Sequence, residues 1–165
     1  MVGEARFPFG KYSGKSIALV ALTDYPYLAY ISDKITTNSL RRDVCRLLFA
    51  LDNFEPQLYC EAECGQKATR FSIAYIDGGW EIDYPYWFCQ NEKCWNKIPG
   101  IGARCEEPIK YSSMIPYALN GPRQQSRKKI AEFQKIMNLA AGFKGVLNEQ
   151  SAQEFIDDLV RKTKA

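Results

Sequence analysis

Apolar residues recur along part of this chain at the spacing of an α-helix. The clearest stripe has one every three or four positions: Leu40, Val44, Leu47, Leu48 and Leu51. Such a period places all of them on one helical face, which is expected to be buried. Asn38 or Ser39 is the predicted N-cap of this helix.

Three further helices are indicated by their start and stop signals. Asp24 is a suitable N-cap for a helix with Pro26 in its first turn. Near the C-terminal end, one apolar face is formed by Ile130, Phe133, Met137 and Ala140. Gly142 is the predicted stop of that helix. The sequence Ser151 to Glu154 is a capping box, so the last helix is predicted to begin there.

The middle of the chain has the two-residue period of β-strands. Phe71, Ile73 and Tyr75 alternate with smaller residues, and a second alternating run follows at 80–84. Asp77-Gly78-Gly79 between them is typical of a hairpin turn. Residues 97–125 are rich in Pro and Gly and are predicted to be irregular.

These elements predict an α+β fold, with a small N-terminal α/β module, a β-hairpin and C-terminal helices. The expected domains are residues 1–52, residues 53–110, and a linker with two helices over 111–165. Hydrophobic residues make up 46% of the 165 positions, enough to build a buried core.

Charge is distributed unevenly along the chain. The net charge is +3 overall, but it is +3 for residues 1–50, −4 for 51–110 and +4 for 111–165. A polyanion would therefore be attracted to the two ends and repelled by the middle.

Residue types also limit the compartment and the chemistry. No apolar run approaches the roughly 18 residues of a membrane span, and residues 1–10 have no signal-peptide core. We therefore expect a cytoplasmic protein, with the nucleoid or nucleus also compatible, and no membrane partner. The chain has no histidine, so imidazole catalysis is excluded and a zinc site must use Cys or carboxylate ligands.

Four of the six cysteines have the spacing of a metal site. Cys60 and Cys64 form one close pair, and Cys89 and Cys94 form another after 24 residues. The predicted hairpin between the pairs returns its two ends to the same place, so four sulfurs should converge. Four thiolates suit zinc, with bonds of about 2.3 Å.

The segment 58–96 resembles the zinc ribbon, in which two cysteine knuckles flank a β-hairpin. The loops of three and four residues depart from the commoner two. The resemblance implies a structural Zn²⁺, because four protein ligands leave no place for water. Free buried cysteines and a redox pair are the alternatives, and Cys105 can replace Cys94. Cys45 is expected to be a plain helix residue, and disulfides fit poorly with a chain that has no signal peptide.

A second resemblance covers residues 6–50. The run Phe9-Gly10-Lys11-Tyr12-x-Gly14-Lys15 fails the spacing of a nucleotide-binding loop. Followed by Ile17 and Asp24-Tyr25-Pro26-Tyr27-Leu28, it is similar to the C-terminal module of exodeoxyribonuclease X-like proteins. Tyr25 is inserted between Asp and Pro, and Tyr30 lies near the family's Trp. The resemblance implies an accessory module associated with nucleic acid, without the nuclease active site.

We therefore expect a zinc-containing accessory protein that binds nucleic acid, DNA rather than RNA, without catalytic activity of its own. The basic residues predicted to contact phosphates are Lys11, Lys15, Arg41, Arg42, Arg123, Arg127, Lys128 and Lys129. Phe9 and Tyr12 either stack on bases or pack in the core. Stacking is also predicted for aromatic residues of the hairpin: Trp80, Tyr84, Tyr86 and Trp87.

Two other functions remain open. The protein can be an interaction subunit of a replication, transcription or nucleic-acid-processing assembly, with the acidic hairpin as its docking face. An enzyme is the weaker alternative, because Asp77, Glu81 and Asp83 are more simply the solvated face of a hairpin.

Overall fold

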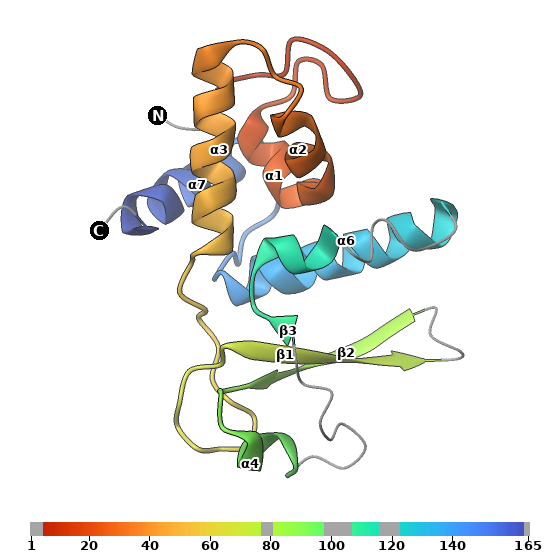
Figure 1. Ribbon diagram of the computed structural model, residues 1–165, viewed down its shortest axis with the longest axis vertical. Helices are drawn as coiled ribbons and strands as arrows, with labels where there is room; N and C mark the ends of the chain where they lie inside the picture. Colours follow the sequence, from red (N-terminus) through yellow and green to blue (C-terminus); the bar gives the residue numbers. More distant parts are fainter. Residues whose placement is uncertain (1–4, 77–80, 98–106, 116–122, 164–165) are drawn as a thin grey trace. The chain divides into compact units, whose positions relative to one another are not determined.

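The computed structural model describes most of the chain, in the ranges 5–76, 81–97, 107–115 and 123–163. These residues form helices and one antiparallel sheet, which confirms the α+β class (Figure 1). The chain divides into two compact units, here called the helical unit and the sheet unit. The helical unit comprises Met1–Phe54, Lys110–Met114 and Phe143–Ala165. The sheet unit comprises Glu55–Ile109 and Ile115–Gly142.

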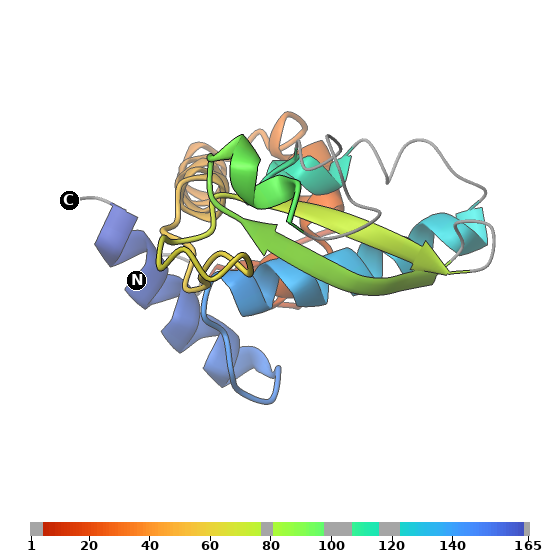
Figure 2. The same cartoon turned by 90° about the horizontal axis from the view of Figure 1, so that it is seen from below.

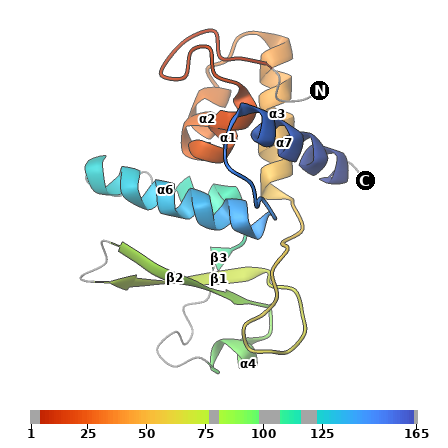
Figure 3. The same cartoon turned by 180° about the vertical axis from the view of Figure 1, so that it is seen from behind.

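The helical unit packs four α-helices and a short 3₁₀ helix around an apolar core. They are α1 (Ile17–Thr23), α2 (Tyr25–Ser32), α3 (Asn38–Asp52), η3 (Tyr111–Met114) and α7 (Glu149–Thr163). The views in Figures 1 and 3 show α7 beside α1 and α3, and it contacts both helices. Tyr111 is completely buried in this unit, with its ring against Tyr25 and Phe54.

Side-chain caps explain where α1 and α2 begin. The Ser16 hydroxyl accepts a hydrogen bond from the Leu19 amide at 3.2 Å, at the start of α1. The Asp24 carboxylate accepts one from the Tyr27 amide at 3.3 Å, and Pro26 lies in the first turn of α2. The prediction for α2 is confirmed.

The apolar stripe of α3 faces the core as predicted. Leu40, Val44, Leu47 and Leu51 are buried, and Leu48 is half-buried at the edge of the stripe. The predicted cap is wrong, because the N-cap is Thr37, whose side chain makes no capping bond. Packing of the apolar face stabilises this helix without a cap.

The last helix begins earlier than its sequence suggested. Helix α7 starts at Glu149, so the predicted start at Ser151 is wrong. The Asn148 side chain accepts a hydrogen bond from the Ser151 amide at 2.9 Å, and the Ser151 hydroxyl accepts one from the Asn148 amide at 3.1 Å. These reciprocal bonds form a capping box shifted by three residues.

The N-terminal stretch holds less β-structure than an α/β module requires. Between residues 5 and 54, the only extended pairing is an isolated bridge between Arg6 and Ser16. It closes a loop in which the Phe7 amide donates to the Lys15 carbonyl at 3.0 Å and the Gly14 amide donates to the Phe7 carbonyl at 2.8 Å. This part of the chain is therefore a closed loop followed by helices.

The sheet unit is built on a hairpin with a short third strand. Strands β1 (Arg70–Ile76), β2 (Glu81–Phe88) and β3 (Glu107–Pro108) are antiparallel, in the order β2-β1-β3. Arg70 is opposite Phe88 and Ile76 is opposite Glu81, with a register shift between Ile73 and Tyr75. The predicted hairpin is confirmed, although its turn at Asp77-Gly78-Gly79 lies outside the described residues.

Helix α6 (Arg123–Ala140) runs along the sheet in both Figures 1 and 2, and it contacts β2. Phe133 packs edge-on against Phe71 of β1, with ring centroids 5.6 Å apart, and Met137 is fully buried. Gly142 has a φ of 91°, in the left-handed region, just after the helix ends. The predicted apolar face and stop are therefore confirmed for these residues.

The compact units group the chain differently from three consecutive domains. Helix α6 belongs to the sheet unit, while α7 belongs to the helical unit. The segment predicted to be irregular contains β3 and η3, and its residues 98–106 and 116–122 lie outside the described part. Over the described ranges, no helix combines the length and apolar character needed to cross a membrane.

Candidate metal centre

The first pair of cysteines lies on a tight turn before β1. Its base is the bridge between Tyr59 and Lys67, and the Cys60 amide donates to the Gln66 carbonyl at 2.9 Å. Glu63 and Gly65 flank Cys64 with positive φ values of 57° and 73°. The left-handed conformation of these two residues curls the backbone around the cysteine side chains.

The second pair follows β2 directly. Cys89 comes after the last residue of the strand, and Cys94 lies in the short helix α4 (Glu92–Trp95). The Asn91 side chain caps this helix by accepting from the Lys93 amide at 3.0 Å. The Trp95 indole N–H donates to the Cys89 carbonyl at 2.9 Å, which holds α4 against the end of the strand.

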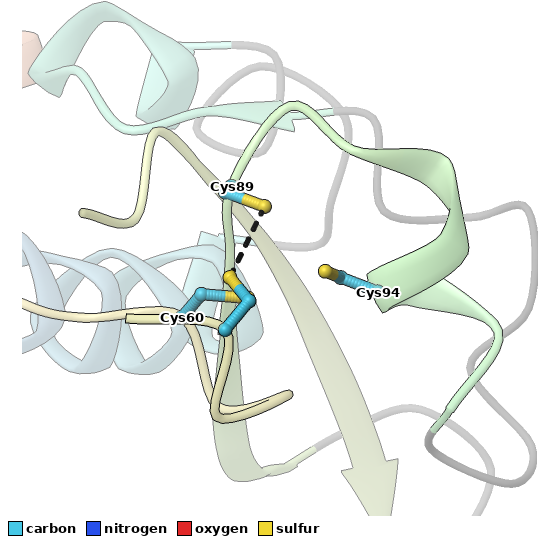
Figure 4. A group of neighbouring side chains, drawn as sticks. Cys60, Cys89 and Cys94 are labelled. Atoms are coloured by element: carbon cyan, nitrogen blue, oxygen red, sulfur yellow. Dashed lines mark hydrogen bonds between the residues drawn. The ribbon is translucent and has the colours of Figure 1, made fainter. Parts of the chain in front are cut away.

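The four sulfurs converge as predicted. All the Sγ atoms of Cys60, Cys64, Cys89 and Cys94 lie within 4.8 Å of one another. Figure 4 shows the Cys94 sulfur pointing from α4 toward those of Cys60 and Cys89. The Sγ atoms of Cys64 and Cys89 are 3.8 Å apart. A tetrahedron with metal–sulfur bonds of about 2.3 Å has edges of about 3.8 Å, so this separation fits four-coordination.

The sulfurs are too far apart for covalent bridges. A disulfide requires a sulfur–sulfur distance of about 2.05 Å, and all four cysteines are free. Three of them are buried, while Cys64 is exposed. The apolar wall of the cluster includes Ala62 and Phe88, with Tyr86 and Trp95 packed against it.

Backbone amides point at three of the sulfurs. The N–H groups of Ala62, Gln66 and Asn91 each donate to the cysteine sulfur two residues earlier in the chain. Such donors stabilise thiolates and fix the direction of their lone pairs. This arrangement suits a site in which the sulfurs bind a metal ion as thiolates.

The thiol pKa values show the same balance between burial and hydrogen bonding. The Gln66 amide lowers the pKa of Cys64 to about 7, whereas burial raises the pKa of Cys60. Burial also raises the pKa of Cys94 to about 12. Without a cation the raised pKa values of Cys60 and Cys94 favour their neutral thiols, and a divalent metal would supply the positive charge that four thiolates require.

The other cysteines lie apart from this cluster or outside the description. Cys45 is on α3 in the helical unit and is exposed. Cys105 lies outside the described residues. Since Cys94 itself reaches the other sulfurs, the cluster is complete with the four cysteines chosen from sequence spacing.

The predicted basic cluster lies at the start of α6. Arg127 and Lys128 are exposed, and Lys129 is partly exposed. The Arg123 side chain lies outside what the structure describes. Helix α6 begins beside the end of the sheet where β1 stops and β2 starts, and the cysteines lie at the opposite end (Figures 1 and 3). A hydrogen bond of 2.8 Å from the Gln57 amide to the Ala140 carbonyl holds the C-terminal end of α6 near the turn that carries Cys60 and Cys64.

The glycine-lysine loop, residues 9–15 of the helical unit, has a structural role that the sequence analysis did not predict. The Lys11 ammonium forms an ion pair of 2.9 Å with Asp24, and the Tyr12 hydroxyl donates to the same carboxylate at 2.9 Å. Lys11 is thereby committed to the cap of α2. Lys15, Arg41 and Arg42 are exposed.

The aromatic residues divide into core and surface. Tyr12 is half-buried, Phe9 is 42% exposed and accessible, and Trp87 is 4% exposed. The stacking role predicted for Trp87 is therefore wrong, because its ring packs against Phe71. Tyr86 is half-buried against the cysteine cluster. Trp80 and the Tyr84 side chain lie outside what the structure describes.

Sequence reasoning missed one candidate site altogether. A groove between α3 and α7 is lined by Arg42, Cys45, Arg46 and Phe49, with Val160 and Thr163 across it. The available signal was Phe49, an aromatic residue off the apolar stripe of its helix.

Comparison with known proteins does not assign the chain to a protein family. No family model, no curated protein and no solved structure matches it.

Proposed function

We propose that this chain is a zinc-containing accessory protein that binds nucleic acid and performs no catalysis of its own. The observation that carries the proposal is the arrangement of the sheet unit, with four convergent cysteine sulfurs at one end and the basic start of α6 at the other. The metal stabilises the unit, and α6 supplies the contacts with phosphate groups.

Zinc is the metal that best suits this donor set. Four thiols at tetrahedral spacing, with amide donors to three of them, match a structural zinc site. Four protein ligands occupy every position of the tetrahedron, so the metal holds the two turns together and activates no water. A two-stranded hairpin is marginal alone, and a metal at its open end offsets that weakness.

Charge favours α6 over the metal end as the contact with phosphates. Glu63 and Glu92 are exposed near the cysteines, and Glu61 is partly exposed. Zinc with four thiolates adds a net charge of −2, which strengthens the repulsion of a polyanion there. Arg127, Lys128 and Lys129 are consecutive at the opposite end, where the positive end of the helix dipole adds to their field.

The proposal that the partner is DNA rests on the resemblance of residues 6–50 to a module of exodeoxyribonuclease X-like proteins. The absence of histidine is consistent with a protein that leaves catalysis to a partner. Phe9, with its ring accessible in the glycine-lysine loop, is the residue best suited to stack on an unpaired base.

Metal analysis tests the first half of the proposal. The purified protein should contain one zinc per chain, and Cys94→Ser should lose it because a hydroxyl is a poor zinc ligand. Cys45→Ser is the matched control and should retain the metal, since Cys45 lies in the other unit. Zinc retained at full occupancy by Cys94→Ser would contradict the site.

Binding to labelled single-stranded and double-stranded DNA, with RNA of the same sequence, tests the second half. The double variant Arg127→Glu/Lys128→Glu should bind at least ~10-fold more weakly, and the salt dependence of its affinity should fall by about 1 unit of slope per phosphate contact. The control Lys93→Glu/Lys135→Glu changes the same charge on exposed lysines of the same unit. Equal losses in both variants would indicate a general charge effect and contradict a site on α6.

An interaction subunit of a nucleic-acid-processing assembly is the second candidate. Tyr86 and Trp95, half-buried against the cysteine cluster, favour it, because aromatic residues are enriched in protein interfaces. Purification of the tagged protein with and without nuclease separates the candidates. A stoichiometric partner that survives nuclease treatment supports the subunit, and loss of all partners supports direct binding to nucleic acid.

A further inference from the structure

A groove of about 510 Å³ lies in the helical unit between α3 and α7. Its lining from α3 is Arg42, Cys45, Arg46 and Phe49, and Val160 and Thr163 line it from α7. Figure 3 shows α7 crossing α3, and the two helices are in contact. The volume lies within the roughly 300–1,000 Å³ of common ligand pockets.

The α3 side of the groove is the face turned away from the core. At 100° per residue, positions 42, 45, 46 and 49 lie opposite the buried stripe of Leu40, Val44, Leu47 and Leu51. An outward face normally carries polar residues, yet Phe49 is 60% exposed there. Across the groove, Val160, which is 5% exposed, and Thr163 form its lining on α7.

The charged residues that line the groove are both basic. Both charged residues of its lining are arginines, and among the described residues neither Arg42 nor Arg46 has an ion pair. Some other basic residues of the unit do have an ion pair, for example Arg161 with Asp158 at 3.0 Å. The two arginines are one helical turn apart, a spacing that places their Cβ atoms about 6 Å from each other.

We propose that this groove binds an acidic amphipathic segment of a partner protein. An apolar side chain of that segment packs on Phe49 and Val160, and two carboxylates one turn apart pair with Arg42 and Arg46. A helix with acidic residues at i and i+4 beside an apolar anchor presents this pattern. Arginine and carboxylate form paired hydrogen bonds, which fix the register of the segment.

The apolar floor favours a peptide over nucleic acid. A phosphate backbone would neutralise the arginines but would leave Val160 and Cys45 facing a polar chain. Nucleic acid could use the two arginines and stack one base on Phe49, so a DNA ligand is the competing outcome of the test.

The probe is a displayed library of random 16-residue peptides, selected on the full-length protein. We expect the enriched peptides to carry two or more acidic residues beside an aromatic or large aliphatic residue. Selection on Phe49→Ala, whose ring is mostly exposed and whose loss leaves the core intact, should remove this enrichment. Failure to enrich any peptide above the Phe49→Ala background would overturn the proposal.

Charge reversal gives the second measurement, with the best selected peptide made synthetically. Arg42→Glu/Arg46→Glu should weaken its binding at least ~10-fold, as truncation of central interface residues commonly does. Lys34→Glu/Lys144→Glu reverses two exposed lysines of the same unit away from the groove and should leave the affinity unchanged. Equal weakening by both pairs would overturn the assignment.

Two further measurements show where the peptide binds and whether the groove prefers a peptide or nucleic acid. Bound peptide should slow alkylation of Cys45, which is exposed and lines the groove. Unchanged alkylation under saturating peptide would place binding elsewhere and reject the groove. If oligo-dT binds in a manner that depends on Phe49 and displaces the peptide, the groove belongs to nucleic acid and the peptide proposal fails.

Discussion

Gly10 and Gly14 have φ values of 78° and 80° in the loop that Phe7 and Lys15 close. Both positions favour glycine, because other residues are strained in this left-handed region. They differ in their surroundings. A Cβ at Gly10 would lie 2.6 Å from the Tyr27 hydroxyl oxygen, whereas a Cβ at Gly14 would meet nothing within 4 Å.

Substitution of each glycine by alanine should separate strain from crowding. Gly14→Ala should lower the free energy of unfolding by about 1 kcal/mol, the cost of a left-handed alanine. Gly10→Ala should lower it by about 2–3 kcal/mol, because the Tyr27 ring is held by Phe7 and Tyr12 and cannot move freely. Chemical denaturation of both variants measures the difference, and equal losses would show that Tyr27 yields without cost.

At the scale of elements, one ion pair joins the first loop to the last helix. Arg6 donates to both carboxylate oxygens of Glu149, at 3.0 and 2.8 Å, although 143 positions separate them. Glu149 is the first residue of α7, where a negative charge also complements the helix dipole. The same carboxylate accepts from the Ser16 amide at 3.4 Å, next to the start of α1.

This pair predicts a pH-dependent contribution to stability. Hydrogen bonding from Arg6 lowers the pKa of Glu149 below its usual 4.5. A lowered pKa in the folded state means that the stabilisation is complete above about pH 4.5 and is lost as the pH falls through the folded value. Between pH 6 and pH 3, Glu149→Gln should therefore lose less stability than the unmodified protein.

Thermal unfolding across that pH range is the measurement. Glu154→Gln, which alters a carboxylate bonded by the Gln150 amide on the same helix, is the control and should follow the unmodified protein. If Glu149→Gln follows it as well, the pair with Arg6 contributes no stability, as is common for exposed ion pairs.

On the scale of the whole molecule, the two compact units should respond differently to metal removal. All four cysteines belong to the sheet unit, and the helical unit has its own buried core around Tyr25, Leu28 and Tyr111. If the proposed zinc site is occupied, removal of the metal should unfold the hairpin, while α1, α2 and α3 should persist.

Hydrogen exchange with and without a strong chelator tests this expectation. Amides of β1 and β2 should lose most of their protection, whereas those of α3 and the second half of α7 should keep theirs. Restoring Zn²⁺ should restore the pattern. A uniform loss over both units would show that the molecule unfolds as one cooperative body.

What could be predicted from the sequence depended on local signals. The cysteine spacing predicted the cluster, because the hairpin that returns the chain is itself encoded locally by alternating residues. The buried stripe of α3 could also be predicted, because it follows from the local spacing of apolar residues. Contacts between distant segments were not, such as Arg6 with Glu149 or Lys11 with the cap of α2. The start of α7 was misplaced because Ser151 resembles a cap, while Asn148 performs that role.

The chain passes between the two units after Phe54, Ile109, Met114 and Gly142. The helices α1 to α3 thus share their compact unit with Tyr111 and all of α7, which come later in the sequence. A fragment ending near residue 54 would leave the faces of α1 and α3 that α7 covers open to water. Such a fragment should aggregate, so the helical unit can complete its fold only after the sheet unit has been translated.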